Sequence, residues 1–415
     1  MSVQSVDGQY AAGHAWINRI AARLCAFILA AAASLSMTLS AYTEELRPTR
    51  VGAVLAGLVA LHLVWHPRII WRREFTFYAY LVAYMFITLM WTNDVDLAMN
   101  TLVPAINFLL VMIFFGSLID FNNVPAVLVG ALCGFVVGAA VYTITQGFPF
   151  SYPDQFSYNA IANMYFFGLF VTLMYSCFKR SNGVLLAIAV VIVLHIVATT
   201  SIKTNLGIAL GLTAAGIMYF RHYVRLLRRK ILILAVLVCG LGFAVASNRG
   251  LVDKMVHGVE RVTVGVEVLQ ARKDVSGYSG FGERDYWKQM GIEGWKQNPV
   301  FGYGTEAFRD DYGITSHSTP IDLLYNYGLI GFVMFYGMFA SLMVRLLQLD
   351  VERFSSQRAL MLAAVVCYIF VSLSGTMHYN IFLAAFIGIS AALLTGHRDA
   401  AASTLAASSQ RVVPR

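Results

Sequence analysis

The chain has 415 residues, of which 58% are hydrophobic and only 13% are charged. Charged residues make up about a quarter of an ordinary soluble domain, so this composition excludes that class and indicates an integral membrane protein. The formal net charge of +8 does not imply nucleic acid, because no nucleic-acid-binding module is recognisable and cytoplasmic loops of membrane proteins are rich in Lys and Arg.

Apolar runs long enough for helices to cross a hydrocarbon core of about 30 Å recur along the whole chain. The runs are continuously apolar and do not alternate, which favours helices over strands as the spanning form. We therefore predict an all-α, polytopic integral membrane protein with about twelve transmembrane helices and one large, partly helical periplasmic loop. The predicted spans cover residues 20–41, 51–66, 75–92, 99–119, 125–145, 160–178, 183–199, 206–220, 231–247, 323–347, 358–376 and 379–396.

The chain divides into four parts. About nine transmembrane helices are expected in residues 1–247 and about three more in 322–396. Between them lies a hydrophilic loop, 248–321, and the Ala/Ser-rich tail 397–415 is expected to be disordered. The apolar stretch that begins at Arg19 is too long for the core of a cleavable signal, so it suits a first span.

Lys and Arg in the short loops predict the orientation, because cytoplasmic loops carry the excess of positive charge. This side is expected to hold both termini, and its basic loops also suit contact with anionic membrane lipids. The loop 248–321 is then expected to face the periplasm or the outside. The basic loops that fall on the cytoplasmic side are 66–74, 179–182, 221–230 and 348–358.

No sequence pattern indicates a metal or a cofactor. The five cysteines lie in or at the edge of apolar runs without a C-x-x-C spacing, which is typical of packing residues. Asp310 and Asp311 are an adjacent acidic pair, but they lack companions at the spacing of metal ligands. No Walker A, G-x-S-x-G or HExxH pattern is present. We therefore predict metal-independent chemistry.

Three residues at the outer side are candidates for catalysis. His317, just before a predicted span, has a side chain whose ordinary pKa suits a general base, although it can equally cap the next helix or bind interfacial water. Arg284 presents a fork of donors suited to phosphate, or it pairs with its acidic neighbours at the surface. Lys203, flanked by apolar runs, either snorkels to the interface or meets an anionic substrate group.

The sequence around these candidates predicts further local structure. Residues 283–297 have the spacing of a short amphipathic helix near the membrane surface, and 298–308 carry Asn-Pro and glycine turn signals. Asp322 follows His317 closely, in a position either to orient it or to cap the next helix. His378, between the last two predicted spans, is equally compatible with a structural and a functional role.

In this order, the elements resemble the bacterial O-antigen ligase and O-antigen polymerase superfamily. The resemblance rests on Arg284 in an aromatic-rich helix, on the N-P-x-x-G-x-G turn from Asn298 to Gly304, and on His317 ahead of a span that opens LLYNYGLIG. Two positions depart from the family pattern. Lys203 stands where the family tends to have Arg, so a charge is kept but bidentate geometry is lost, and Ser318 stands where Asn commonly follows the His.

The resemblance implies a glycosyltransferase of the periplasmic face of the bacterial inner membrane. Its donor would be an undecaprenyl-diphosphate-linked glycan and its acceptor lipid A–core, with no metal or other cofactor. His317 would be the general base, with Lys203 and Arg284 stabilising the diphosphate. The residues assigned to substrate binding are Tyr286, Trp287, Asn298, Gly302, Gly304 and Asp322.

Other functions remain open on the sequence. A polymerase that joins lipid-linked repeat units shares the same signature, but polymerases often carry two sizeable basic outer loops, and the earlier loop 146–159 holds no Lys or Arg. That difference favours a ligase. A protein O-glycosylating transferase is a further alternative from the same superfamily. A transporter of lipid-linked glycan would need polar residues dispersed through the membrane and often repeated halves, and neither is evident.

Overall fold

The computed structural model describes residues 4–40, 48–65, 69–120, 123–146, 158–178, 183–198, 204–211, 213–214, 282–349 and 351–410. Within these ranges all regular secondary structure is α-helical, which confirms the predicted all-α class. The helices are α1 (Gln4–Ser40), α2 (Pro48–Trp65), α3 (Arg73–Thr88), α4 (Val95–Leu118), α5 (Val124–Gln146), α6 (Tyr158–Phe178), α7 (Gly183–Ala198), α10 (Gly282–Gln297), α11 (Ala307–Tyr312), α12 (Thr319–Gln348), α13 (Val351–Ser372) and α14 (Ile381–Gln410).

The predicted spans fall on helices wherever the structure describes them. Among the described residues, five helices hold a stretch long and apolar enough to cross a membrane, namely α1, α4, α5, α6 and α12. Shorter apolar helices cover Arg50–Val64, Gly183–Ile196, Ser356–Ser372 and Ile381–Thr395. The expected span 231–247 and the first part of the loop, 248–281, lie outside the described residues. The number of spans therefore stays a prediction, while the multi-pass architecture has direct support.

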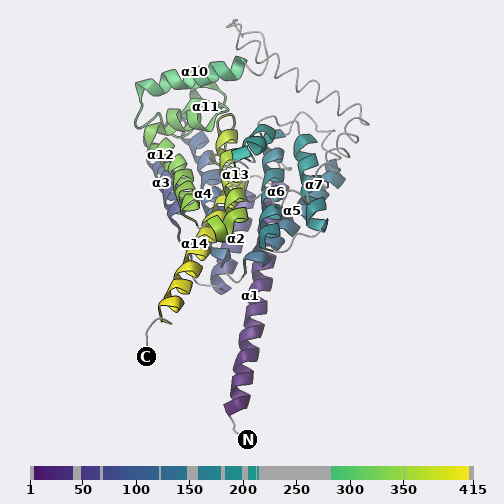
Figure 1. Ribbon diagram of the computed structural model, residues 1–415. Helices are drawn as coiled ribbons and strands as arrows, with labels where there is room; N and C mark the ends of the chain where they lie inside the picture. Colours follow the sequence, from purple (N-terminus) through teal and green to yellow (C-terminus); the bar gives the residue numbers. More distant parts are fainter. Residues whose placement is uncertain are drawn as a thin grey trace.

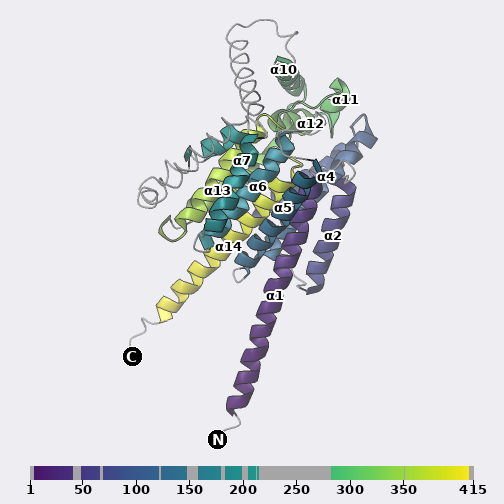
Figure 2. The same cartoon turned by 90° about the vertical axis from the view of Figure 1, so that its right-hand side faces the viewer.

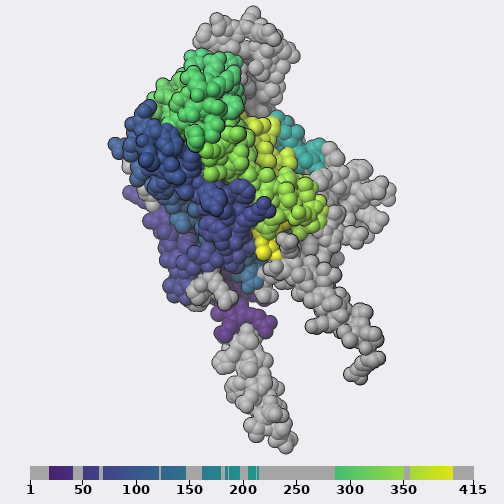
Figure 3. Space-filling view, turned by 90° about the vertical axis from the view of Figure 1, so that its left-hand side faces the viewer, coloured from purple at the N-terminus to yellow at the C-terminus, as the bar shows by residue number. Residues whose placement is uncertain are grey.

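The helices form one bundle with a cap at one end. Figure 1 and Figure 2 show α1 to α7 and α12 to α14 side by side, with α10 and α11 across one end. In Figure 3 the green residues of α10 and α11 cover that end of the bundle. Helix α1 begins and α14 ends beyond the opposite end (Figure 1). The termini and the cap thus lie at opposite ends, as the predicted orientation requires.

The tail after Gly396 differs from the prediction of disorder. Helix α14 continues to Gln410, well past the end of its apolar part. The extension is rich in alanine, the residue with the highest helix propensity, and it follows directly from a helix that is already nucleated. Local propensity therefore outweighs the low hydrophobicity from which disorder was predicted.

Helices α1 and α5 approach each other through a stripe of small residues. A Cβ added at Gly130 would lie 2.3 Å from the carbonyl oxygen of Phe27, and one at Gly134 would lie 2.1 Å from that of Ala31. Glycines four residues apart present a flat helix face, which lets two backbones come close where lipid offers no hydrophobic drive to association. This face fixes the first helix of the chain against the fifth.

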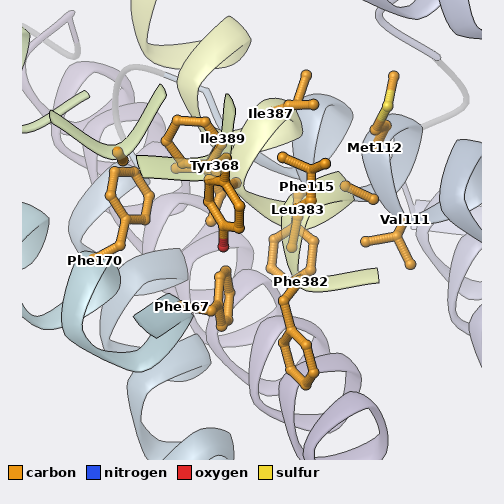
Figure 4. Close-up of a cluster of buried hydrophobic side chains, with 14 of the residues drawn as sticks. Val111, Met112, Phe115, Phe167, Phe170, Tyr368, Phe382, Leu383, Ile387 and Ile389 are labelled. Atoms are coloured by element: carbon orange, nitrogen blue, oxygen red, sulfur yellow. The ribbon is translucent and has the colours of Figure 1, made fainter. Parts of the chain in front are cut away.

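An aromatic core joins α4, α6, α13 and α14 in the middle of the bundle (Figure 4). The ring of Phe386 lies 4.8 Å from that of Phe170 and 5.1 Å from that of Tyr368, measured between centroids. Such tilted and edge-to-face pairs add packing energy beyond the area that they bury. Because α14 contributes to this core on several sides, the last helix is a central element of the fold.

A buried ion pair joins α3 to α12 near the end of the bundle opposite the cap. Arg345 Nη1 donates to Glu74 Oε2 at 2.8 Å, and the Glu74 side chain is fully buried. Arg345 also donates to Thr395 Oγ1 of α14 at 2.7 Å. A buried charge persists in such a setting only when it is paired and hydrogen-bonded, so these contacts lock three helices together.

Candidate active site

Helix α12 is broken at Gly328, whose φ and ψ are 60° and −161°. The backbone groups freed by the break are paired with the preceding segment 299–304, which we call the strap. Tyr303 N donates to Tyr325 O at 3.0 Å, and Gly304 N donates to Asn326 O at 2.8 Å. Beyond the break, Leu329 N donates to Pro299 O at 2.9 Å. The strap therefore satisfies the backbone polar groups that an interrupted helix would otherwise leave unpaired.

The close contact between the strap and the break explains the glycines of the N-P-x-x-G-x-G turn. Gly302 has a φ of 70°, and a Cβ there would lie 2.5 Å from the backbone of Asn326. A Cβ at Gly328 would lie 2.2 Å from Val300 O. Both positions need left-handed backbone and an empty Cβ site, and only glycine provides both without strain.

The residues of this turn contact the protein's own backbone. Asn298 Nδ2 donates to Gly302 O, and a Cβ at Gly304 would lie 3.1 Å from Thr92. Thr305, at the end of the strap, accepts or donates a 2.8 Å hydrogen bond with the Thr88 hydroxyl of α3. These contacts give Asn298, Gly302 and Gly304 a role in building the strap, and their assignment to substrate binding stays a prediction.

His317 occupies a tight turn immediately before α12. Its φ is 57°, one of two left-handed values for residues other than glycine among the described residues. Ser316 Oγ donates to Ser318 O at 2.9 Å and accepts from Ser318 N at 3.1 Å, which closes the turn around His317. Histidine tolerates left-handed backbone better than most residues, and such strain gathers at functional sites.

Asp322 holds this turn from within α12. Its Oδ1 accepts a hydrogen bond from Ser316 N at 3.1 Å, and its Oδ2 accepts one from Thr376 Oγ1 at 3.2 Å. Thr319 Oγ1 in turn donates to Gly375 O at 2.6 Å. Asp322 therefore holds the backbone of the His317 turn, and the loop after α13 braces the same turn. The predicted roles of Asp322 in orienting the His317 side chain and in binding substrate stay predictions.

A cavity of 340 Å³ lies beside the His317 turn, between α4, α11, the start of α12 and the loop before α14. Thr315 and Asp322, which flank His317 in the sequence, belong to its wall. Nine of its ten lining residues carry a polar side-chain group. The lining residues are Thr101, Glu306, Phe308, Arg309, Thr315, Asp322, Asn326, Thr376, His378 and Tyr379.

Glu306 is the second left-handed residue, with a φ of 60° at the start of α11. Its side chain is buried. Burial raises the pKa of Glu306 above the ordinary value, while hydrogen bonds from the Thr101 and Tyr379 hydroxyls and the nearby charge of Arg309 act in the opposite direction. The sequence reasoning gave Glu306 no role, because nothing in its neighbours indicates that it points into a cavity.

His378 reaches the same cavity from the loop between α13 and α14. The residue is 1% exposed, yet neither ring nitrogen has a hydrogen-bond partner among the described residues. Burial lowers the pKa of His378 to about 3, so the ring is neutral at neutral pH. A buried polar ring without a partner is rare in native structures and calls for a specific explanation.

Helix α10 confirms the predicted helix at 283–297 and places Arg284 in its first turn. The helix packs tightly on the start of α12, since a Cβ at Gly294 would lie 2.3 Å from the Tyr325 ring. Trp287 is half-buried with its ring 5.8 Å from that of Tyr312, and Tyr286 is exposed. The Arg284 side chain and the whole of Lys203 lie outside the described parts, so their proposed contact with a diphosphate stays a prediction.

The family model for O-antigen ligases matches residues 187–336. This match places residues 187–336 in the O-antigen ligase superfamily. The match covers α10, the strap, α11, the His317 turn and the first half of α12, so it falls on the site described above. A search of the curated proteins finds no match to the chain.

Membership of the O-antigen ligase superfamily confirms the resemblance stated from the sequence. It supports a glycosyltransferase function of the ligase or polymerase type in a multi-pass membrane protein. Lipid-linked glycan and lipid A–core are partners of this superfamily in general. In the described part of the chain, no three His, Cys, Asp or Glu side chains are placed to hold one metal ion. The expectation of metal-independent transfer stays a prediction.

Proposed function

We propose that the protein is an O-antigen ligase. It transfers a glycan from undecaprenyl diphosphate to a hydroxyl of lipid A–core at the capped end of the bundle, with His317 as the general base. The observation that carries this proposal is the turn of His317, strained at φ 57°, held by Asp322 through Ser316 N, and flanked by two residues that line a polar cavity. Strained backbone persists only where the surrounding structure holds it, and it is most common at active sites.

The position of His317 suits two substrates that are both anchored in lipid. The residue lies just before α12, a helix long and apolar enough to cross the membrane. A base at the membrane surface meets the diphosphate and the acceptor sugar at the depth where each leaves the hydrocarbon core. The proposal places this end of the bundle at the periplasmic face of the bacterial inner membrane.

The reaction is a displacement at the anomeric carbon of the donor sugar. The acceptor hydroxyl oxygen forms a bond to that carbon, the bond from the carbon to the diphosphate oxygen breaks, and the hydroxyl proton passes to the His317 imidazole. Positive charge near the leaving diphosphate lowers the barrier, because negative charge develops there in the transition state. Arg284 of α10 and Lys203 are assigned this task, and Tyr286 and Trp287 are assigned to glycan contact.

Two considerations favour ligase over polymerase. The loop 146–159, which would be a second outer loop, contains no Lys or Arg. The polar cavity beside the His317 turn is small, at 340 Å³, near the lower end of the roughly 300–1,000 Å³ range of ligand pockets. A small pocket suits one defined acceptor sugar better than a growing chain of repeat units.

The test is transfer by the purified full-length protein in detergent or nanodiscs. Lipid-linked glycan and lipid A–core are supplied without ATP, with a chelator in one arm, and the joined product is separated by gel. The wild type is expected to form it in both arms, and His317→Ala is expected to lose about 10²–10⁴-fold in rate. His195→Phe is the matched control, because His195 of α7 lies outside the cavity and stacks on Tyr165 at 4.9 Å.

Each alternative has a distinct outcome in this assay. Elongation of lipid-linked glycan when no lipid A–core is present would show that the protein acts as a polymerase and not as a ligase. Movement of lipid-linked glycan across a vesicle membrane that needs Lys203 or His195 but not His317 would support a transporter. Full activity of His317→Ala would remove the proposed base.

A further inference from the structure

The cavity beside the His317 turn contains more polar chemistry than the proposed reaction uses. Glu306 comes from the start of α11 and His378 from the loop before α14, 72 positions later in the chain. Neither residue belongs to the turn of the base. Glu306 is 8% exposed and His378 is 1% exposed, so both are largely withdrawn from bulk water.

His378 points to a ligand because its hydrogen-bonding capacity is unused. Both ring nitrogens are buried, and neither finds a partner among the described residues. Its ring contacts are apolar faces, with the Tyr379 ring centroid at 3.8 Å and that of Phe335 at 6.3 Å. A neutral imidazole has one donor and one acceptor. Leaving such a group unpaired in the interior costs free energy that a bound hydroxyl would recover.

The charges around the cavity indicate what class of ligand it takes. Two carboxyl groups, those of Glu306 and Asp322, line it, and Arg309 is exposed at its edge. These carboxyl groups give a diphosphate no positive charge to pair with, and they repel it whenever they are ionised. A sugar ring instead offers hydroxyl donors to Glu306 and both donors and acceptors to the neutral ring of His378. The Thr101 and Tyr379 hydroxyls add further polar contacts.

We propose that this cavity is a sugar-binding subsite, in which Glu306 and His378 hydrogen-bond the hydroxyl groups of one pyranose ring. The cavity volume of 340 Å³ suits a single sugar unit and not a polysaccharide. The inference rests on the proposed function in one respect only, the expectation that the substrates are glycans. It gives Glu306 and His378 the task of selecting and positioning the sugar, while the diphosphate lies outside the cavity.

The bound ring can come from the acceptor core or from the donor glycan, which share this chemistry. The geometry favours the acceptor. Thr315 and Asp322 flank His317 in the sequence and line the cavity, although His317 itself does not, so a ring bound there lies beside the turn that carries the base. Glu306 is also held in a left-handed backbone conformation, which fixes its carboxyl group relative to α4 and α12.

The test measures binding separately from transfer. Full-length protein carrying His317→Ala, which is not expected to turn over, is titrated by calorimetry with two probes. One is the soluble core oligosaccharide released from lipid A, and the other is the donor glycan released from its lipid carrier. Glu306→Gln keeps the size of the side chain and replaces one carboxyl oxygen by an amide donor, and His378→Phe keeps an aromatic ring and removes both ring nitrogens. His195→Phe in the same background is the matched control, a buried histidine outside the cavity whose Nδ1 lies 2.7 Å from Val191 O.

The subsite predicts a loss of about tenfold or more in affinity for one probe in both variants, with the control unchanged. Loss confined to the core oligosaccharide assigns the subsite to the acceptor, and loss confined to the donor glycan assigns it to the donor. Unchanged affinity for both probes in folded Glu306→Gln and His378→Phe would overturn the proposal, as would a wild type that binds neither probe. Thermal unfolding of each variant establishes that it is folded.

Kinetics with active protein separate this inference from the proposed function. In the wild-type background, Glu306→Gln and His378→Phe are expected to raise KM for one substrate about tenfold while kcat at saturation changes less. A fall in kcat with both KM values unchanged would contradict a binding role. If the wild type binds a probe but joins no glycan to lipid A–core, the proposed function fails and the subsite stands.

Discussion

Asp322 accepts a hydrogen bond from the backbone N–H of Ser316 at 3.1 Å, one residue before His317. The carboxyl group belongs to a membrane-spanning helix, and the N–H belongs to the strained turn that carries the proposed base. A second bond, from Thr376 Oγ1 to Asp322 at 3.2 Å, ties the same carboxyl group to the loop after α13. Through Asp322, two parts of the bundle determine the position of His317.

Replacing Asp322 by Ala should therefore harm both stability and rate. The change leaves Ser316 N–H buried without its acceptor, at a cost of about 1–3 kcal/mol. It also frees the His317 turn, and misplacement of a base by about 1 Å costs on the order of 10²-fold in rate. Asp322→Asn keeps an oxygen for Ser316 and should lose less. The measurements are the thermal unfolding midpoint and kcat at saturating acceptor.

Asp94 provides the matched control for Asp322. It is the N-cap of α4 and accepts a hydrogen bond from Leu97 N at 2.8 Å, outside the cavity. Asp94→Ala should cost about 1 kcal/mol, as N-cap losses do, without changing kcat. Equal effects of the Asp94 and Asp322 substitutions on kcat would contradict a positioning role for Asp322.

The left-handed backbone of His317 predicts a difference between two inactive variants. His317→Gly and His317→Ala both remove the base, so both should lose transfer. Glycine accepts a φ of 57° without strain, whereas a Cβ there costs about 1–2 kcal/mol. The Gly variant should consequently unfold at a higher temperature than the Ala variant. The reverse order of unfolding midpoints would show that the turn relaxes when the imidazole is lost.

The break in α12 depends on Gly328. A Cβ there would lie 2.2 Å from Val300 O at a φ of 60°. Gly328→Ala should cost about 2–5 kcal/mol from the sum of backbone strain and overpacking, and it should displace the strap and abolish transfer. Thermal unfolding and the transfer rate are measured together, because the strap leads directly into Glu306.

Gly313 is the control for Gly328, because it shares the left-handed backbone conformation but not the close contact of an added Cβ. Its φ is 70°, but a Cβ there would meet nothing within 4 Å. Gly313→Ala should therefore lower the free energy of unfolding only by the strain of the left-handed conformation, about 1–2 kcal/mol, and transfer should be retained. If Gly328→Ala lowers the unfolding midpoint and the transfer rate no more than Gly313→Ala does, the backbone pairing between the strap and the break in α12 is not important for stability or transfer.

The ion pair between Glu74 and Arg345 should matter for stability and not for substrate binding. Glu74→Gln leaves Arg345 partly buried without its charge partner, which costs about 3–5 kcal/mol for a buried pair. The pair lies at the far end of α3 and α12 from the strap and the His317 turn. Unfolding midpoints and the acceptor KM of the folded protein check the two parts of this prediction.

A double-variant cycle completes the test of this pair. Glu74→Gln combined with Arg345→Met should be less destabilised than the sum of the two single variants, because neither charge is then left alone. Simple additivity would show that the two side chains act independently of each other. A raised acceptor KM in folded Glu74→Gln would indicate that the pair influences the site across the bundle.

The architecture could be predicted from the sequence because lipid imposes it. Continuous apolar runs of sufficient length have to be helices, and 99–119 and 323–347 indeed fall on α4 and α12. The helix at 283–297 was predicted from the spacing of its apolar residues, and the proximity of Asp322 to His317 indicated a link between the two. Each of these inferences used only local information.

The site could be predicted only in part, because its remaining features depend on distant contacts. The interruption of α12 at Gly328 requires the strap as a backbone partner, and no local pattern states which segment supplies it. Glu306 is buried by Thr101 of α4 and Tyr379 of the loop before α14, both far away in the sequence. The orphaned ring of His378 is visible only once its surroundings are known.

The most direct measurement of the central claim is the rate of glycan transfer to lipid A–core by purified His317→Ala, beside wild type and His195→Phe. We expect a loss of about 10²–10⁴-fold for His317→Ala, with normal transfer by His195→Phe and an unfolding midpoint that shows each variant to be folded. Transfer by folded His317→Ala at the wild-type rate would contradict the account, because the turn that Asp322 holds would then carry no catalytic base.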